Sequence, residues 1–358
     1  MGGPPQVCSC LLAEQSQKHE CWLASYRANE DEVPLSEGVQ RVPVAGYGID
    51  EKMLGRVSKR AFTDLNVPFD VIHLHNVWEP ILLAAAKFAN QSKIPYVITP
   101  HGMLDPWSLA QKTAKKKVAL ALGRRQLLER AKFIHVLTAE EKDNVRKEGF
   151  KNHCEVIPNG VDLEKVDRAL NPLPFKNEFP KLTEKPFILF LGRLHYVKGL
   201  DILANAMPEF FAKFPEWRLV VAGPDGGAQR DFEDAISKSG CSEKVHVIGP
   251  IYGDKKFSLL ANCEIFCQPS RQEGFSVSIL EALSAAKPVA ITTHCRFEEV
   301  TQRSCGTVDE LDSAAIAQSL CKLAGSRDRK QWGLNGRKLV EEKYTWSLVS
   351  EQLLARYV

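Results

Sequence analysis

The sequence predicts an α/β protein with two doubly wound domains, and three observations support this prediction. Short apolar runs alternate with longer amphipathic stretches, which is typical of parallel α/β architecture. The alternation stops at residues 158–186, where several prolines break any helix, and then starts again. A chain of 358 residues has room for about two domains of ~150 residues each. We therefore expect domains at residues 1–165 and 166–344.

In the first domain, six apolar runs predict strands. These are residues 21–25, 39–44, 70–75, 95–100, 132–138 and 155–158. Helices are expected between them, at residues 80–91 and 139–148. At the start, Gly2 and Gly3 precede Pro4 and suit a turn from a strand into a helix, since proline favours the first helical position. Because no strand leads into this turn, we expect a first domain that lacks its first strand.

The second domain repeats the alternation. Its expected strands are residues 186–193, 217–223, 245–249, 264–269, 288–293 and 306–308. Its expected helices are residues 199–214, 276–286 and 312–325. A doubly wound sheet binds its ligand beyond the carboxyl ends of its strands, so the loops after the strands are where site residues are expected.

Composition and charge exclude several classes of protein. Hydrophobic residues make up 44% of the chain and charged residues 25%, so we expect neither a disordered nor a fibrous chain. The net charge of +3 gives no sign of a nucleic-acid partner. No apolar run approaches the ~18 residues of a membrane helix, and the first residues lack the features of a signal peptide. We therefore expect a cytoplasmic protein whose ten scattered cysteines are reduced thiols.

The segment 268–287 carries the most information about function. A polar loop with Glu273 and Gly274 leads into a helix that starts near Ser276, a suitable N-cap. The helix is apolar almost all round, which predicts burial, and yet it contains Glu281. A buried carboxylate needs a partner, and either a ribose diol or a structural Arg or Lys would serve. The backbone N–H groups from Gly274 onward, together with the helix dipole, suit a diphosphate.

Two cations and one histidine follow other expected strands. Arg193 and Lys198 lie five residues apart on a turn that enters a helix. They suit an anionic ligand at the end of a strand, although two solvated surface cations would fit the same pattern. His101, in the sequence Thr-Pro-His-Gly, ends a strand of the first domain. It is expected at the edge of the crevice, with a hydrogen-bonded turn histidine as the alternative.

Residues 108–134 are unusually basic, with eight Lys and Arg against one Glu, or +7. Leucines and valines are interleaved with these cations, so we expect a basic amphipathic helix. Such a helix could contact an anionic membrane surface at the inner face or a phosphorylated acceptor. A solvated outer helix is the alternative.

Several motifs are absent from the sequence. It contains no DxD, GxGxxG, GxxxxGK[ST], GxSxG or HExxH motif. Dehydrogenase, P-loop NTPase, serine hydrolase and zinc protease functions therefore lose support. Without DxD, we also expect no metal of the kind that metal-dependent sugar transferases use.

Together, these motifs resemble the retaining GT-B glycosyltransferases of group 1, family 4. The resemblance is carried by EGFSVSILEAL, GRLHYVKGLDIL, IPNGVD, TPHG and GGPPQV, in this family's order and spacing, and by YTWSLVSEQLLARYV near the C-terminus. It implies two Rossmann-like domains facing each other across a cleft. It also implies that a terminal helix, residues 345–358, returns to the first domain.

The resemblance implies a role for each candidate residue. Arg193 and Lys198 would hold the donor diphosphate, with amides near Gly274, Phe275, Ser276 and Val277. Glu281 would bind the ribose, Glu273 the hydroxyls of the donor sugar, and His101 would face that sugar. Gly2 and Gly3 would let backbone approach the phosphates.

The resemblance also implies an activity. The expected enzyme moves a hexose from a nucleoside-diphosphate sugar to a hydroxyl acceptor, with retention of configuration and with neither metal nor cofactor. The acceptor would be a polysaccharide or a lipid-linked glycan. The alternatives are a non-catalytic nucleotide-sugar-binding protein and a sugar-nucleotide epimerase or a phosphorylase of the same fold.

Overall fold

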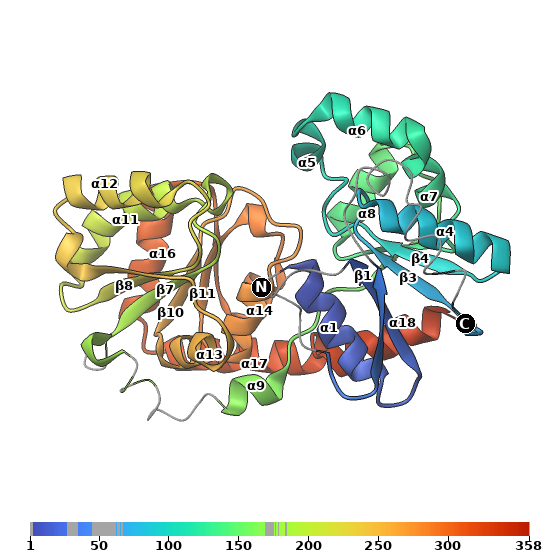
Figure 1. The fold of residues 1–358 in the computed structure, drawn as a ribbon. Coiled ribbons are helices and arrows are strands. Elements are labelled where there is room, and N and C mark those ends of the chain that lie inside the picture. The colour runs from blue at the N-terminus through green and yellow to red at the C-terminus, as the bar shows by residue number, and fades with distance from the viewer. Residues whose placement is uncertain are drawn as a thin grey trace. The chain divides into compact units, whose positions relative to one another are not determined.

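The computed structural model describes residues 3–26, 35–44, 62, 65, 67–168, 175, 177, 179–182 and 185–357. The chain divides into two compact units (Figure 1). The first unit comprises Met1–Asn159 and Trp346–Val358, and the second comprises Gly160–Thr345. Each unit is a parallel α/β structure, as the sequence predicted.

The second unit contains a six-stranded parallel sheet in the order β12-β11-β10-β7-β8-β9. Its strands are β7 (Phe187–Leu191), β8 (Arg218–Ala222), β9 (Val245–Gly249), β10 (Ile265–Gln268), β11 (Val289–Thr292) and β12 (Gly306–Asp309). The first strand, β7, lies between β8 and β10, so the strand order reverses there. In doubly wound sheets this reversal opens a crevice at the carboxyl ends of the two central strands.

Helices cover both faces of this sheet, because side chains alternate between the faces along each strand. The helices are α11 (Leu200–Lys213), α12 (Gln229–Lys238), α13 (Gly253–Asn262), α14 (Val277–Ser284), α15 (Glu299–Gln302), α16 (Ser313–Gly325) and α17 (Arg329–Lys343). Ile188 and Phe190 of β7 pack with α11, α12 and α16 in one core. Leu189 and Leu191 pack with α13, α14 and α17 in the other. The two helix groups lie on opposite sides of the strands in Figure 1.

The first unit contains two separate parallel sheets. One pairs β1 (Cys21–Tyr26) with β2 (Val39–Val44), and the other has the order β3-β4-β5-β6. The strands of the second sheet are β3 (Ile72–His75), β4 (Tyr96–Thr99), β5 (Ile134–Val136) and β6 (Cys154–Val156). Among the described residues of this unit, no strand joins the two sheets.

The helices of the first unit include the two that the sequence predicted. These two are α4 (Pro80–Ser92) and α8 (Ala139–Lys147). Two further helices are α1 (Pro4–Gln15) and α18 (Trp346–Tyr357). Pro4 begins α1, and Gly3 before it has a φ of 74°, so the predicted glycine turn is present. Gly2 lies outside the described residues. Val7 and Leu11 of α1 pack against Trp346, Val349 and Leu353 of α18 in a small core.

Shorter elements also occur in the described part of the second unit. They are α9 (Leu163–Arg168), η2 (Pro180–Leu182), η3 (Tyr196–Lys198), η4 (Ser242–Lys244) and η5 (Thr293–Cys295). No cysteine forms a disulfide, and seven of the ten are buried. Since apolar surroundings favour the neutral thiol, burial raises the pKa of Cys263 to about 12.

The prediction of one basic amphipathic helix at residues 108–134 is wrong. The segment forms α5 (Pro106–Ala110), α6 (Thr113–Ala119), a π-turn η1 (Leu120–Arg124) and α7 (Arg125–Glu129). Gln111 is extended and Lys112 is left-handed, which ends α5. Gly123 has a φ of 112°, which no regular helix allows. Charge and apolar spacing therefore indicated helix correctly, but they did not reveal these two breaks.

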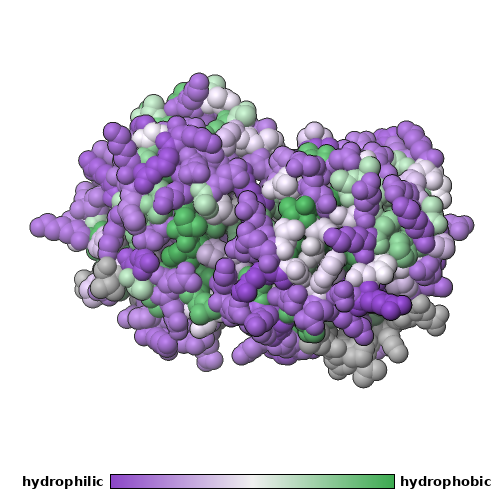
Figure 2. All heavy atoms as spheres, turned by 180° about the vertical axis from the view of Figure 1, so that it is seen from behind, coloured by the Kyte–Doolittle hydropathy of each residue, from purple (hydrophilic) through white to green (hydrophobic). Residues whose placement is uncertain are grey.

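The surface is largely hydrophilic on the face that Figure 2 shows. Within the described parts of the chain, no helix combines the length and the apolar character needed to cross a bilayer.

The packing of α17 on the end of α14 predicts the effect of Gly333→Ala. A Cβ at Gly333 would lie 1.9 Å from the carbonyl oxygen of Ala286. Overpacking of this kind costs ~1–3 kcal/mol, so we expect a melting temperature several degrees lower in a thermal-unfolding experiment. Gly325→Ala is the control, because its Cβ would lie an ordinary 3.6 Å from the Phe214 ring. If both variants melt like the wild type, the packing described here is incorrect.

Candidate functional site

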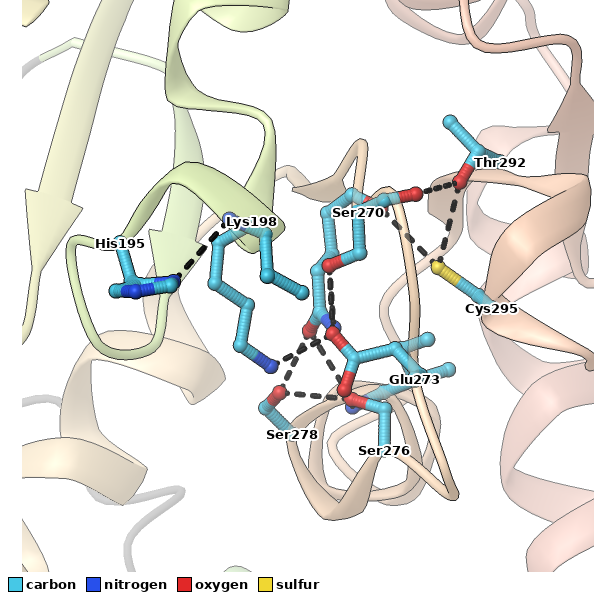
Figure 3. A network of polar contacts seen from close by, with 11 residues as sticks. His195, Lys198, Ser270, Glu273, Ser276, Ser278, Thr292 and Cys295 are labelled. Atoms are coloured by element: carbon cyan, nitrogen blue, oxygen red, sulfur yellow. Dashed lines mark hydrogen bonds and ion pairs between the residues drawn. The ribbon is translucent and has the colours of Figure 1, made fainter. Parts of the chain in front are cut away.

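The loops that follow β7 and β10 meet at a lysine–glutamate pair. Lys198 ends η3, after β7, and Glu273 lies in the loop after β10. The Nζ atom of Lys198 is 2.6 Å from Oε1 of Glu273. Figure 3 shows the two side chains pointing toward each other. The structure therefore brings together two of the predicted site residues, 75 positions apart in the chain.

Glu273 is held by three donors that all reach the same oxygen. In addition to Lys198, the Nε2 atom of Gln268 and the hydroxyl of Ser270 each donate to Oε1 at 2.6 Å. The Glu273 residue is only 8% exposed, so these hydrogen bonds compensate for the burial of its charge. No hydrogen bond from the described residues reaches Oε2. That oxygen keeps its capacity to accept a hydrogen bond.

Gln268 fixes this arrangement from the last position of β10. Its Oε1 atom accepts from the hydroxyls of Ser276 at 3.1 Å and Ser278 at 2.6 Å. Because that oxygen faces two hydroxyl donors, the amide nitrogen must face Glu273. Ser276 is the N-cap of α14 and accepts from the backbone N–H of Ile279, as the sequence predicted. One buried glutamine thus couples the carboxylate to the start of α14.

Two glycines allow the loops at this end of the sheet to touch. A Cβ at Gly199, where φ is 70°, would lie 1.9 Å from the carbonyl oxygen of Pro269. A Cβ at Gly223 would lie 1.8 Å from the carbonyl oxygen of Gly192. Only glycine fits at such approaches. The backbone conformation that carries Lys198 is therefore fixed by contacts on both sides.

Arg271 locks the same loop from outside. Its guanidinium donates to both carboxylate oxygens of Asp201 at 2.7 Å and lies over the ring of Tyr196. Its backbone N–H donates to the carbonyl of Val197 at 2.7 Å. This bidentate pair, which sequence analysis did not anticipate, ties the loop after β10 to the start of α11.

Arg193 lies in the same turn as Lys198, but its side chain is exposed. Its stem passes over Gly226, where a Cβ would lie 2.9 Å from the Cγ of Arg193. Its guanidinium forms neither a hydrogen bond nor an ion pair with any described residue. The structure therefore places Arg193 at the end of the sheet where site residues were expected. Its side chain has no partner among the described residues and takes no part in the Lys198–Glu273 ion pair.

The start of α14 presents unpaired backbone donors. The N–H groups of Gly274, Phe275, Ser276 and Val277 donate to no acceptor among the described residues. The Phe275 ring packs near the rings of Phe297 and Tyr344, which holds this turn against the core. Free N–H groups at a helix N-terminus form a favourable environment for an anion.

Glu281, in the second turn of α14, is paired with Lys256 of α13. The Lys256 Nζ atom is 2.5 Å from Glu281 Oε1, and the two side chains are 18% and 10% exposed. The structural partner that the sequence left open is therefore present. Among the described residues, no hydrogen bond or ion pair joins Glu281 to Lys198 or Glu273, so the four charged groups predicted for the site do not form one network.

In the first unit, His101 follows β4 with a φ of 54°. Its Nε2 atom forms a 3.0 Å hydrogen bond with Nδ1 of His75. His73 and His135 lie nearby on adjacent strands, so four histidines gather in this unit. In the described part of the chain, no group of three or more His, Cys, Asp or Glu is arranged to hold a metal ion.

Sequence analysis missed three residues on which the site depends. Gln268 and Ser270 carry a weak signal, because they are polar residues at the end of a strand that is otherwise apolar. Lys256 carries none, because its pairing with Glu281 spans 25 residues and requires α13 to lie beside α14.

The fold is that of the GT-B glycosyltransferases. Sucrose-phosphate synthase from Thermosynechococcus elongatus matches with a TM-score of 0.80 at 18% identity, over 99% of this chain and 93% of that one. The Anabaena protein Alr3699/HepE, solved with UDP and glucose, matches with a TM-score of 0.77 at 16% identity, over 99% and 95%.

Sequence comparison defines the family. The description "Glycosyltransferase Family 4" matches residues 1–165, and "Glycosyl transferases group 1" matches residues 174–339. Phosphatidyl-myo-inositol mannosyltransferase from Mycobacterium leprae is 27% identical over 310 residues, which is 81% of this chain and 73% of that protein. The chain belongs to the group 1, family 4 glycosyltransferases, and the predicted resemblance is confirmed.

The four histidines predict that acid destabilises the first unit. Burial lowers the pKa of His75 to about 3 and that of His135 to about 4, and it also lowers the pKa of His73 and His101. In the unfolded chain histidines protonate near pH ~6.5, so the unfolded state binds more protons below that pH. Stability is therefore full above pH ~6.5 and falls by about 1.4 kcal/mol per pH unit for each such histidine as the pH drops toward 4.

Urea unfolding at pH 7 and pH 5 measures this effect. We expect a lower midpoint at pH 5, and a smaller difference for His135→Gln than for the wild type. His19→Gln, which removes an exposed histidine, is the control and should keep the wild-type difference. Equal midpoints at the two pH values would show that these rings are not buried in neutral form.

Proposed function

We propose that this glycosyltransferase transfers a hexose from a nucleoside-diphosphate sugar to a hydroxyl acceptor, with retention and without a metal ion. The observation that carries the proposal is Lys198 beside Glu273, next to the unpaired N–H groups of residues 274–277. A cation and a helix N-terminus suit a diphosphate, and a carboxylate with one available oxygen suits a sugar hydroxyl. Alr3699/HepE, of the same fold, was solved with UDP and glucose, which supports a donor of this class.

In this proposal the fixed cations and dipoles stabilise the leaving group. As the bond between the anomeric carbon and the diphosphate oxygen breaks, negative charge grows on that oxygen. Lys198, Arg193 and the amides at the start of α14 would stabilise this charge. Because the Lys198 loop is held by Gly199 and Arg271, the cation needs little reorganisation. A divalent ion is then not required for charge neutralisation.

Two carboxylates would bind the two ends of the donor. Glu273 would accept from a hydroxyl of the sugar through Oε2, since Oε1 is occupied. Glu281 would accept from the ribose hydroxyls, and Lys256 would have to share or release it. His101 would contact the donor sugar, a role that rests on the family resemblance.

The identity of the acceptor is proposed separately from that of the donor. We propose a glycan or a lipid-linked glycan, met in the cytoplasm, in part at an anionic membrane surface. Lys112, Lys115 and Lys117 are exposed and supply positive charge there, together with the exposed apolar side chains of Val118 and Leu122. Two other cations of the segment form hydrogen bonds to backbone carbonyls of the first unit instead. The Nζ atom of Lys116 donates to the carbonyl of Ser108, and Arg124 donates to that of Trp78.

Lys198→Met tests the proposal as a whole. Donor hydrolysis and transfer are measured on a panel of nucleotide sugars, with glycan and lipid-linked acceptors and with EDTA present. We expect the wild type to be active and the variant to lose ~100-fold or more in kcat, since one preorganised donor to a developing oxyanion is worth that much. Lys238→Met, on the exposed end of α12, should keep full activity.

Several outcomes would contradict the proposal. They are wild-type binding without turnover, conversion of the donor sugar without any acceptor, loss of activity in EDTA, or an active Lys198→Met variant. The melting temperature of Lys198→Met is recorded alongside, because the change leaves Glu273 with two donors in place of three.

Glu281→Gln separates the ribose role from the structural role. The affinity for a nucleoside diphosphate and for inorganic pyrophosphate is measured by calorimetry. If Glu281 binds the ribose, the variant binds the nucleoside diphosphate about tenfold more weakly and pyrophosphate equally well, because a hydrogen bond to a charged group contributes ~1.5 kcal/mol or more. If Glu281 only pairs with Lys256, the two ligands change together or not at all.

A further inference from the structure

The histidines of the first unit form a hydrogen-bonded chain across β3, β4 and β5. His135 Nε2 lies 2.7 Å from the carbonyl oxygen of Ile157, and His135 Nδ1 lies 2.8 Å from the hydroxyl of Thr99. That hydroxyl lies 2.6 Å from His73 Nε2, and His73 Nδ1 lies 2.6 Å from the Tyr357 hydroxyl. The chain therefore runs from the end of β6 to the last turn of α18.

The position of every proton in this chain follows from its carbonyl end. A carbonyl only accepts, so Nε2 of His135 carries a proton, and Nδ1 of the neutral ring accepts from Thr99. The Thr99 oxygen must then accept from Nε2–H of His73. Nδ1 of His73 in turn accepts from Tyr357. These hydrogen bonds therefore fix the protons of His135, Thr99 and His73 in one arrangement.

His75 and His101 extend this cluster by stacking and by one further hydrogen bond. The ring of His75 stacks on His73 with centroids 4.2 Å apart and on His101 with centroids 5.2 Å apart. The hydrogen bond between His75 Nδ1 and His101 Nε2 places one proton between the two rings. Whichever ring carries that proton, His101 has only Nδ1 left for another partner.

The backbone of His101 is held by a second group. Glu141 of α8 is completely buried. It accepts from the backbone N–H of Gly102 at 2.6 Å and from that of Leu137 at 2.7 Å. Gly102 directly follows His101, whose left-handed φ of 54° is costly for a residue with a side chain. A buried carboxylate that ties this turn to β5 can hold that conformation in place.

We propose that His75 and Glu141 are positioning residues for His101: Glu141 holds its left-handed backbone, and His75 holds its ring in one orientation and one neutral tautomer. The inference rests on the proposed function for the role of His101 at the donor sugar. The positioning of His101 by His75 and Glu141 is a property of the first unit and can be measured without substrate. It makes Nδ1 of His101 the atom through which this residue would meet a sugar hydroxyl.

The test combines the ¹⁵N NMR signals of the imidazole nitrogens with kinetics. These signals distinguish the two neutral tautomers and the protonated ring. In the wild type at pH 7 we expect one tautomer for His101. In His75→Phe, which keeps an aromatic ring but removes the hydrogen bond, we expect a mixture of tautomers. His75→Asn places an amide near the position of Nδ1 and should restore one tautomer in part.

The kinetic arm uses the same variants. We expect His75→Phe and Glu141→Gln to lower kcat about tenfold to a hundredfold with a smaller change in the KM for the donor, because a displaced group weakens the transition state more than donor binding. Tyr357→Phe is the matched control. It removes the far end of the histidine chain and should lower the melting temperature while the His101 signals and kcat stay at wild-type values.

Each outcome has a definite meaning. If the His101 signals in His75→Phe equal those of the wild type, the proposal is wrong. If Tyr357→Phe changes the His101 signals and kcat as much as His75→Phe does, His75 has only a structural role and the proposal is again wrong. If the signals change as expected but the wild type transfers no sugar, the positioning is correct and the proposed function fails. Because His75→Phe is sufficient for the test, unfolding of Glu141→Gln would leave these conclusions unchanged.

Discussion

The buried carboxylate of Glu273 imposes a requirement that the surrounding loops satisfy. A negative charge removed from water must be hydrogen-bonded, and here Lys198, Gln268 and Ser270 all donate to one oxygen. To supply these donors, the loop after β7 must approach the loop after β10 closely. That approach in turn requires glycine at position 199. The site geometry, the glycine and the ion pair are therefore consequences of a single electrostatic constraint at the point where the strand order reverses.

Much of this structure could be predicted from the sequence, because its signals are local. Each apolar run that predicted a strand coincides with a strand of the structure. Ser276 was identified as the cap of α14 from its position alone. The candidate charges at positions 193, 198 and 273 were found because they follow strands, and parallel strands end at one edge of a sheet. The family followed from the order of these motifs.

The features that escaped prediction depend on contacts between distant segments. Nothing near Lys256 in the sequence indicates that α13 lies beside α14, and nothing near Glu141 indicates that its carboxylate reaches the turn after β4. Likewise, the breaks in the basic segment depend on the backbone angles of Lys112 and Gly123. The pattern of charges in the sequence does not reveal these angles. His73 and His75 lie two residues apart on β3, but nothing near them in the sequence indicates that Tyr357 bonds to His73 or that His101 bonds to His75.

The self-paired charges also bear on how an anionic substrate is first attracted. Lys198 forms an ion pair with Glu273, and Lys256 forms one with Glu281. Arg193 is exposed and forms no ion pair with any described residue, so it contributes the uncompensated charge of this group. Under the proposed function, capture of the donor from a distance and its retention after contact would depend on different residues. Added salt should slow the encounter chiefly by screening Arg193, while the exchange of partners inside the site is largely insensitive to ionic strength.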